Sequence, residues 1–240
     1  MRDGDLALIL EAASFFGSKG YNATIIGGKA VAVYAELSGV ESISKDLDVY
    51  VTEAQQQRLF VEAAKVPGVQ VVSKPQPRSL RVLVLDWKGL EVDVLISSAG
   101  LPPPETVWKT AWKYPKHPHV RIVDPFSLLK NKLQVNRPKD QPHIKILHAY
   151  VEGLIKTAFE ARWPKRLEYG KKFLDATGST KMPGDLFDFV APFADRVVGP
   201  FLVQTAPSRE AALRACGFMP APEQVAVLSM IERVHPSKRA

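Results

Sequence analysis

A strict alternation of acidic and apolar residues constrains the fold of this chain more than any other feature. In the stretch DLDVYV, Asp46 and Asp48 alternate with three apolar residues. Successive side chains of an extended strand point to opposite faces, so the two carboxylates share one face. We therefore expect a sheet with one buried apolar face and one face that carries acids.

A second alternating stretch, LEVDVLIS, supplies further carboxylates. It is the second half of a predicted hairpin over residues 78–97, with its turn at Lys88-Gly89, and it places Glu91 and Asp93 on one face. Neighbouring carboxylates raise each other's pKa unless a cation lies between them, and oxygen ligands suit Mg²⁺ or Mn²⁺. Three acids on adjacent strands can bind two such ions for phosphoryl transfer. The alternative is a half-exposed edge strand with an acidic solvent side.

The glycine pair Gly27-Gly28 lies between a predicted strand, residues 23–26, and a predicted helix, residues 27–37. Backbone N–H groups at such a helix start can bind a phosphate, and a side chain would block its approach. Lys29 offers a phosphate partner or a solvated charge. A tight turn alone would also explain the two glycines.

The order of the predicted elements indicates an α+β fold in two parts. A helix over residues 6–16 precedes the strand-helix-strand opening, and a capped helix from Thr52 and a strand over residues 67–72 follow it. Residues 100–106 read as a proline-rich loop. From Asp124-Pro125, a helix cap with proline in the first turn, we expect only helices, including one over residues 186–198. The predicted domains are residues 1–123, catalytic, and residues 124–240, helical.

Composition and charge narrow the class of protein. The 240 residues are 46% hydrophobic, without an apolar run of membrane-spanning length or a signal peptide, so we expect a cytoplasmic protein. The single cysteine, Cys216, excludes an internal disulfide and is expected to pack on a helix face. The net charge is +7, and residues 126–181 carry twelve Lys or Arg against five Asp or Glu. That surplus fits a solvated helical surface or a phosphate-binding face.

These motifs together resemble the DNA polymerase β-like nucleotidyltransferase superfamily. The glycine pair, the paired acids and Asp93 match its site motifs in order, and LLKNKLQVNRPKDQPHIKIL resembles the Lys and Arg-x-Lys-Asp block of its abortive-infection and type IV toxin–antitoxin branch. The matching motifs extend from residue 27 to residue 147. The resemblance implies a nucleotidyltransferase-like mixed sheet flanked by helices, followed by a helical C-terminal part.

The resemblance also implies a role for each matching residue. Asp46, Asp48 and Asp93 would bind the metal ions, with Asp93 also the general base, and Gly27 and Gly28 would hold the nucleotide phosphates. Further nucleotide contacts would come from the later block, namely Lys132, Arg137, Lys139 and Asp140, with Lys130 a weaker candidate. Lys132 and Asp140 could instead only form an ion pair that joins two helices. His143 stands where many relatives have an aspartate. It would either take over the hydrogen-bonding role of that aspartate or cap the helix.

The function implied is metal-dependent transfer of a nucleoside monophosphate from a nucleoside triphosphate (NTP) to an acceptor hydroxyl. The toxin branch implies an RNA acceptor, such as the 3′ end of a transfer RNA, and an antitoxin protein as partner. Two alternatives stay open: a small antibiotic-type acceptor, which a positive protein disfavours when the antibiotic is itself cationic, and an inactive fold that serves as a binding module.

Overall fold

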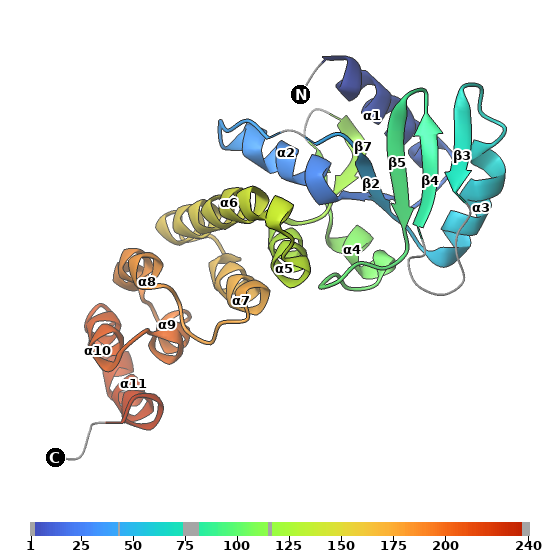
Figure 1. Ribbon diagram of the computed structural model, residues 1–240. Coiled ribbons are helices and arrows are strands. Elements are labelled where there is room, and N and C mark those ends of the chain that lie inside the picture. Colours follow the sequence, from blue (N-terminus) through green and yellow to red (C-terminus); the bar gives the residue numbers. More distant parts are fainter. Residues whose placement is uncertain (1–2, 43, 74–81, 115–116, 237–240) are drawn as a thin grey trace. The chain divides into compact units, whose positions relative to one another are not determined.

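The computed structural model describes residues 3–42, 44–73, 82–114 and 117–236. In these residues seven strands form one sheet in the order β3-β4-β5-β2-β1-β7-β6 (Figure 1). The strands are β1 (Thr24–Ile26), β2 (Leu47–Tyr50), β3 (Val69–Ser73), β4 (Val82–Trp87), β5 (Leu90–Leu95), β6 (Trp112–Tyr114) and β7 (His117–Ile122). The sheet is mixed, because β2 pairs parallel with β5 and antiparallel with β1.

Helices connect the strands and make up everything after β7. They are α1 (Asp3–Ser18), α2 (Gly27–Leu37), α3 (Glu53–Ala63), α4 (Pro104–Thr110), α5 (Pro125–Val135), the 3₁₀ helix η1 (Pro138–Asp140), α6 (Gln141–Glu160), α7 (Arg166–Thr177), α8 (Gly184–Val190), the 3₁₀ helix η2 (Ala191–Phe193), α9 (Gly199–Thr205), α10 (Arg209–Gly217) and α11 (Ala221–Val234). The predicted α+β fold with a helical C-terminal part is therefore confirmed.

The alternation along β2 and β5 produces the predicted two-faced sheet. On the apolar face Leu47, Val49 and Val92 are each 1% exposed or less. The rings of Phe15 and Phe16 in α1 lie against Trp87 of β4 on this face, with centroids 5.1 and 6.2 Å away. Burial of these side chains supplies the main stabilisation of the sheet.

The position of β2 rules out one alternative. It lies between β5 and β1 in the middle of the sheet, so Asp46 and Asp48 are not the acidic side of an edge strand. The hairpin from β4 to β5 turns at Lys88 and Gly89, both with positive φ, as predicted, while its predicted start at residues 78–81 lies outside the described residues.

Four elements differ from the sequence prediction. Residues 100–106 were expected to form a loop, but α4 begins at Pro104, where the missing N–H of proline costs nothing in the first turn. The predicted helix over residues 186–198 is interrupted after Val190, because Pro192 cannot continue the hydrogen-bond ladder. The short β6 and α9 were not predicted at all.

The chain forms two compact units, Met1–Tyr150 and Val151–Ala240. The change from strands to helices occurs between β7 and α5, where residue 124 was predicted to begin the second domain, whereas the units divide within α6. Asp124 caps α5, as predicted, by accepting from the backbone N–H of Ser127. Cys216 is buried in the second unit, where burial raises the pKa of its thiol.

Over the described ranges, no helix has both the length and the apolar character that crossing a bilayer requires.

Candidate active site

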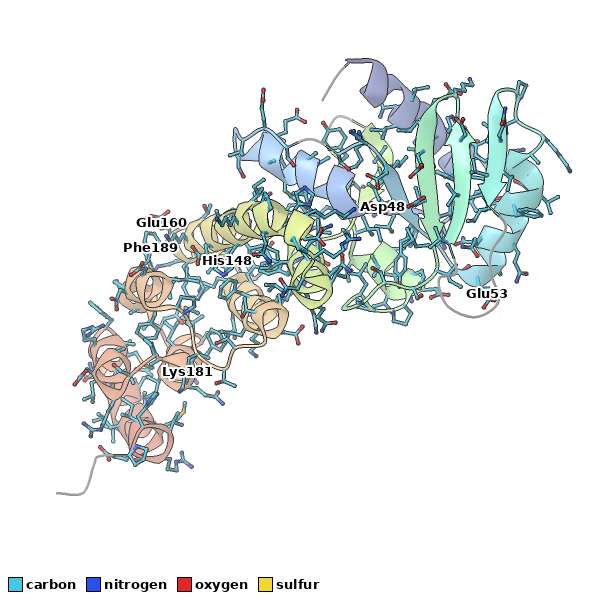
Figure 2. The ribbon with its side chains drawn as sticks, viewed as in Figure 1. Asp48, Glu53, His148, Glu160, Lys181 and Phe189 are labelled. Atoms are coloured by element: carbon cyan, nitrogen blue, oxygen red, sulfur yellow. The ribbon has the colours of Figure 1, made fainter. Side chains whose placement is uncertain are left out.

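Four carboxylates gather on the polar face of the sheet, directly before β2, on β2 and on β5. Asp48 of β2 (Figure 2) is the register partner of Asp93 on the parallel strand β5. Oxygen atoms of Asp46, Glu91 and Asp93 lie within 4.8 Å of one another. The structure thus places two of the predicted metal ligands, Asp46 and Asp93, in one group with Glu91, whose part the sequence left open. Asp48 lies beside Asp93 but does not belong to that group of three.

The environment of Asp48 disfavours its charged form. Burial, followed by the charges of Asp46 and Asp93, raises the pKa of Asp48 to about 6. The Lys132 ammonium and a hydrogen bond from the Gly28 N–H act in the opposite direction. A cation among these carboxylates would relieve their mutual repulsion.

The glycine pair lies directly against these carboxylates. Gly27 has φ +66°, and a Cβ built on it would lie 1.8 Å from Oδ2 of Asp48. A Cβ on Gly28 would lie 2.3 Å from Oγ of Ser44. Both positions therefore exclude side chains, and the turn brings backbone N–H groups to the acidic face.

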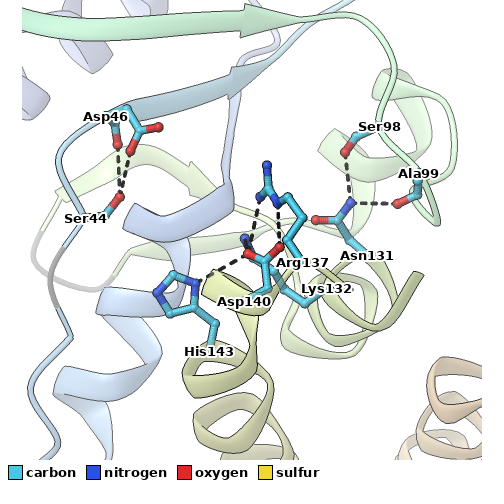
Figure 3. Close-up of polar contacts among 9 residues, drawn as sticks. All are labelled: Ser44, Asp46, Ser98, Ala99, Asn131, Lys132, Arg137, Asp140 and His143. Atoms are coloured by element: carbon cyan, nitrogen blue, oxygen red, sulfur yellow. Dashed lines mark hydrogen bonds and ion pairs between the residues drawn. The ribbon is translucent and has the colours of Figure 1, made fainter. Parts of the chain in front are cut away.

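Ser44 is a site residue that the sequence reasoning missed. Its hydroxyl donates to Oδ1 of Asp46 at 3.1 Å and also contacts the backbone oxygen of Asp46 at 3.3 Å (Figure 3). Ser44 thereby orients the first aspartate of the pair. The only signal in the sequence was a serine two residues before an aspartate, a common local hydrogen-bonding pattern.

Asp93 carries an unsatisfied oxygen. Its Oδ1 is buried and, in the part of the chain described, has no hydrogen-bond partner. Burial and then the neighbouring charge of Glu91 raise the pKa of Asp93, while Lys139 lowers it. A buried carboxylate oxygen without a donor is suited to accept a proton or to bind a cation.

Lys132, Arg137 and Asp140 of the block predicted at residues 132–140 form an ion-pair cluster beside the acids, in which Lys132 and Asp140 are buried. Nζ of Lys132 lies 2.8 Å from Oδ1 of Asp140, and Nε of Arg137 lies 2.7 Å from Oδ2 (Figure 3). Lys132 and Asp140 are 4% and 1% exposed. The ion pair between helices is therefore present, and the charge of Lys132 also acts on Asp48.

His143 lies between the cluster and the glycine turn. Its Nδ1 is 3.9 Å from Oδ1 of Asp140, and its Cε1 is 3.8 Å from the Cβ position of Gly28. Burial, and then the positive charge of Lys132, lower the pKa of His143, so that its imidazole is neutral near pH 7.

Two lysines considered from the sequence have other surroundings. Lys29, in the first turn of α2, is buried rather than solvated, with 4% exposure. Lys130 lies two residues before Lys132 in α5, and side chains two apart on a helix point about 200° from each other. Lys130 therefore does not share the direction of Lys132.

The donor set fits a hard divalent cation. Asp46, Glu91 and Asp93 offer only carboxylate oxygens, which Mg²⁺ and Mn²⁺ prefer, and the orphaned Oδ1 of Asp93 provides a ligand atom without another partner. The site combines such a cation-binding group with a glycine turn at a helix start. It lies on a mixed sheet that helices flank.

Three solved structures are similar to the chain. The solution structure of the antibiotic-resistance factor ANT(2″)-Ia covers 71% of this chain and 98% of that protein, with 16% identity and a TM-score of 0.45. The crystal structure of ANT(2″)-Ia in complex with adenylyl-2″-tobramycin covers 79% and 97%, with 14% identity and a TM-score of 0.37. That of an antigenic nucleotidyltransferase-like protein from Paracoccidioides brasiliensis covers 97% and 93%, with 13% identity and a TM-score of 0.36. The chain matches no protein-family model, and no curated protein matches its sequence.

Proposed function

We propose that this protein is a metal-dependent nucleotidyltransferase that transfers a nucleoside monophosphate from an NTP to an acceptor hydroxyl. The observation that carries the proposal is the convergence of Asp46, Asp48 and Asp93 on one sheet face, directly against the Gly27-Gly28 turn. An acidic surface patch without a function would not require glycine at two adjacent positions, 27 and 28, where the side chains of Asp48 and Ser44 occupy the space of a Cβ.

The carboxylates would hold Mg²⁺ or Mn²⁺, which would neutralise the triphosphate when bound. The absence of side chains at Gly27 and Gly28 brings the N-terminus of α2 directly against the acids, where its backbone N–H groups would donate to the phosphates. Asp93, whose buried Oδ1 has no hydrogen-bond partner among the described residues, is the proposed base. It would take the proton of the acceptor hydroxyl as that oxygen attacks the α-phosphorus and pyrophosphate leaves.

The cationic cluster would stabilise the negative charge of the nucleotide. Lys132 acts on Asp48 and Lys139 on Asp93, so both cations lie near the acids that would face the triphosphate. Asp140 holds Lys132 and Arg137 in position through the two ion pairs. Positioning and charge stabilisation of this kind supply most of the catalysis of phosphoryl transfer.

RNA is the acceptor that we favour, because the positive surplus of residues 126–181 suits a polyanion. A transfer RNA 3′ end, a toxin role and an antitoxin partner rest on the family resemblance alone. A small hydroxylated compound is the second acceptor class.

The test combines the protein with Mg²⁺, each of four α-labelled NTPs, and either total cellular RNA or a set of hydroxylated small molecules. Label in RNA supports the favoured acceptor, and label only in small molecules supports the second. Absence of transfer to either would contradict the enzymatic function and favour a binding module.

The variant Asp48→Asn should reduce label transfer by at least about a hundredfold, because it removes a charge from the proposed metal site while conserving shape. Asp188→Asn is the matched control, since Asp188 is an exposed α8 residue paired with Arg214. Full activity of Asp48→Asn, with both variants folded by circular dichroism, would refute the metal assignment.

A further inference from the structure

A cavity of about 310 Å³ opens in the first compact unit, away from the carboxylates. Leu47 and Val49 line it, and along β2 these residues alternate with Asp46 and Asp48. Adjacent residues of a strand point to opposite faces, so the floor of the cavity lies on the face of the sheet opposite to the candidate active site.

The floor of the cavity is apolar. Phe16 of α1 and Ile25 of β1 join the two β2 residues there, and all four are at most 8% exposed. A volume near 300 Å³ is at the small end of the range for ligand pockets. The floor would accept an apolar body of two or three aromatic rings.

The rim of the cavity is cationic. Lys113 of β6 and Arg121 of β7 both line it, and they are register partners on neighbouring strands. The guanidinium carbon of Arg121 lies 4.9 Å from the ring centre of Trp108, which also lines the cavity. None of the described residues that line the cavity is an Asp or Glu.

Among the described residues, Arg121 uses few of its hydrogen-bond donors. Within the described ranges its guanidinium donates one hydrogen bond, from Nη1 to the backbone oxygen of Ala111 at 3.5 Å, whereas a guanidinium has five N–H donors. The contact with the Trp108 ring restricts the Arg121 side chain, which lowers the entropy lost when an anion binds.

We propose that this cavity is a binding site for a small aromatic anion, with its rings on the apolar floor and its carboxylate or sulfonate at Lys113 and Arg121. The combination of an apolar floor, two rim cations and no lining acid matches that class of ligand. The site is separate from the NTP site and does not depend on the proposed activity.

The probe for the test is 1-anilinonaphthalene-8-sulfonate, which carries two ring systems and one sulfonate. We expect binding of one molecule per chain, measured by fluorescence and by calorimetry. The neutral analogue N-phenyl-1-naphthylamine should bind about tenfold more weakly or worse, because it lacks the charge-assisted hydrogen bonds to the rim.

Substitutions of residues that line the cavity test whether the probe binds there. Arg121→Met and Lys113→Met should each weaken binding by about tenfold, whereas Lys171→Met, at an exposed lysine of α7, should leave it unchanged. Ala23→Phe places a ring in the cavity and should abolish binding while circular dichroism stays normal. Asp48→Asn should bind the probe as the unaltered protein does, which separates this site from the proposed catalytic one.

Several bound probes per chain, equal affinity for the neutral analogue, or unchanged binding by Arg121→Met and Ala23→Phe would each overturn the proposal.

Discussion

Gly27 is constrained by two separate physical causes. Its φ of +66° costs an L residue about 1–2 kcal/mol, and the Asp48 carboxylate occupies the space of a Cβ. We expect Gly27→Ala to lower the free energy of unfolding by at least that amount and to displace Asp48. Urea unfolding measures the first effect, and loss of Mn²⁺ binding measures the second.

Gly28 provides the matched comparison, because its φ is not positive and its obstacle is the Ser44 side chain alone. Gly28→Ala should therefore be destabilising by itself, although alanine normally favours a helix over glycine. Ser44→Gly removes the obstructing Oγ and Cβ atoms, so the double variant should be more stable than the sum of the two single changes predicts. Strict additivity would show that the overlap with Ser44 does not determine this position.

The pair of Lys132 and Asp140 joins two elements, α5 and η1. Asp140→Asn would leave the buried Lys132 ammonium without its counter-ion, and we expect a loss of about 3–5 kcal/mol in the free energy of unfolding. Arg137→Met is the control, because the Arg137 side chain is 50% exposed and its pair with Asp140 should contribute about 1 kcal/mol or less. Comparable losses in the two variants would refute the dominance of the buried pair.

The same pair predicts a dependence on pH. Burial raises the pKa of Asp140, but the hydrogen bonds from Arg137 and Lys132 outweigh it and lower that pKa well below the ordinary value. A lowered pKa in the folded state contributes stability above the unfolded value of about 4, and this contribution is lost as the pH falls further. The stability difference between the unaltered protein and Asp140→Asn should therefore shrink below about pH 4.

Sequence alone predicted the elements whose pattern is local. Period-two alternation identified β2 and β5, and side-chain caps identified the starts of α3 and α5. The elements it missed, β6 and α9, are three and seven residues long. Segments of this length form because tertiary neighbours hold them, and no window of sequence shows those neighbours.

At the scale of the whole molecule, the three aspartates of the candidate site could be predicted from the sequence, but Ser44 and the contacts within the site could not. Alternation placed Asp46, Asp48 and Asp93 on one face, while the register that makes Asp48 and Asp93 partners depends on a parallel pairing between distant segments. The contact of Ser44 with both Asp46 and the Gly28 position likewise requires the folded chain. The cavity behind β2 had no sequence signal, because its lining comes from six separate elements and a loop.

The net charge of +7 is a property of the whole molecule, and it predicts a salt dependence of KM that distinguishes an RNA acceptor from a small uncharged acceptor. A protein that neutralises several phosphates releases counterions, so KM for an RNA acceptor should rise about tenfold or more between 50 and 200 mM salt. A small uncharged acceptor should show almost no such change.

Lys145→Gln and Lys171→Gln, at exposed lysines of the basic segment, should each reduce the slope of log KM against log salt by about 1 where the lysine contacts a phosphate. Lys65→Gln, at an exposed lysine outside that segment, should leave the slope unchanged. A salt-independent KM for RNA would mean that the positive surplus is only a solvated surface.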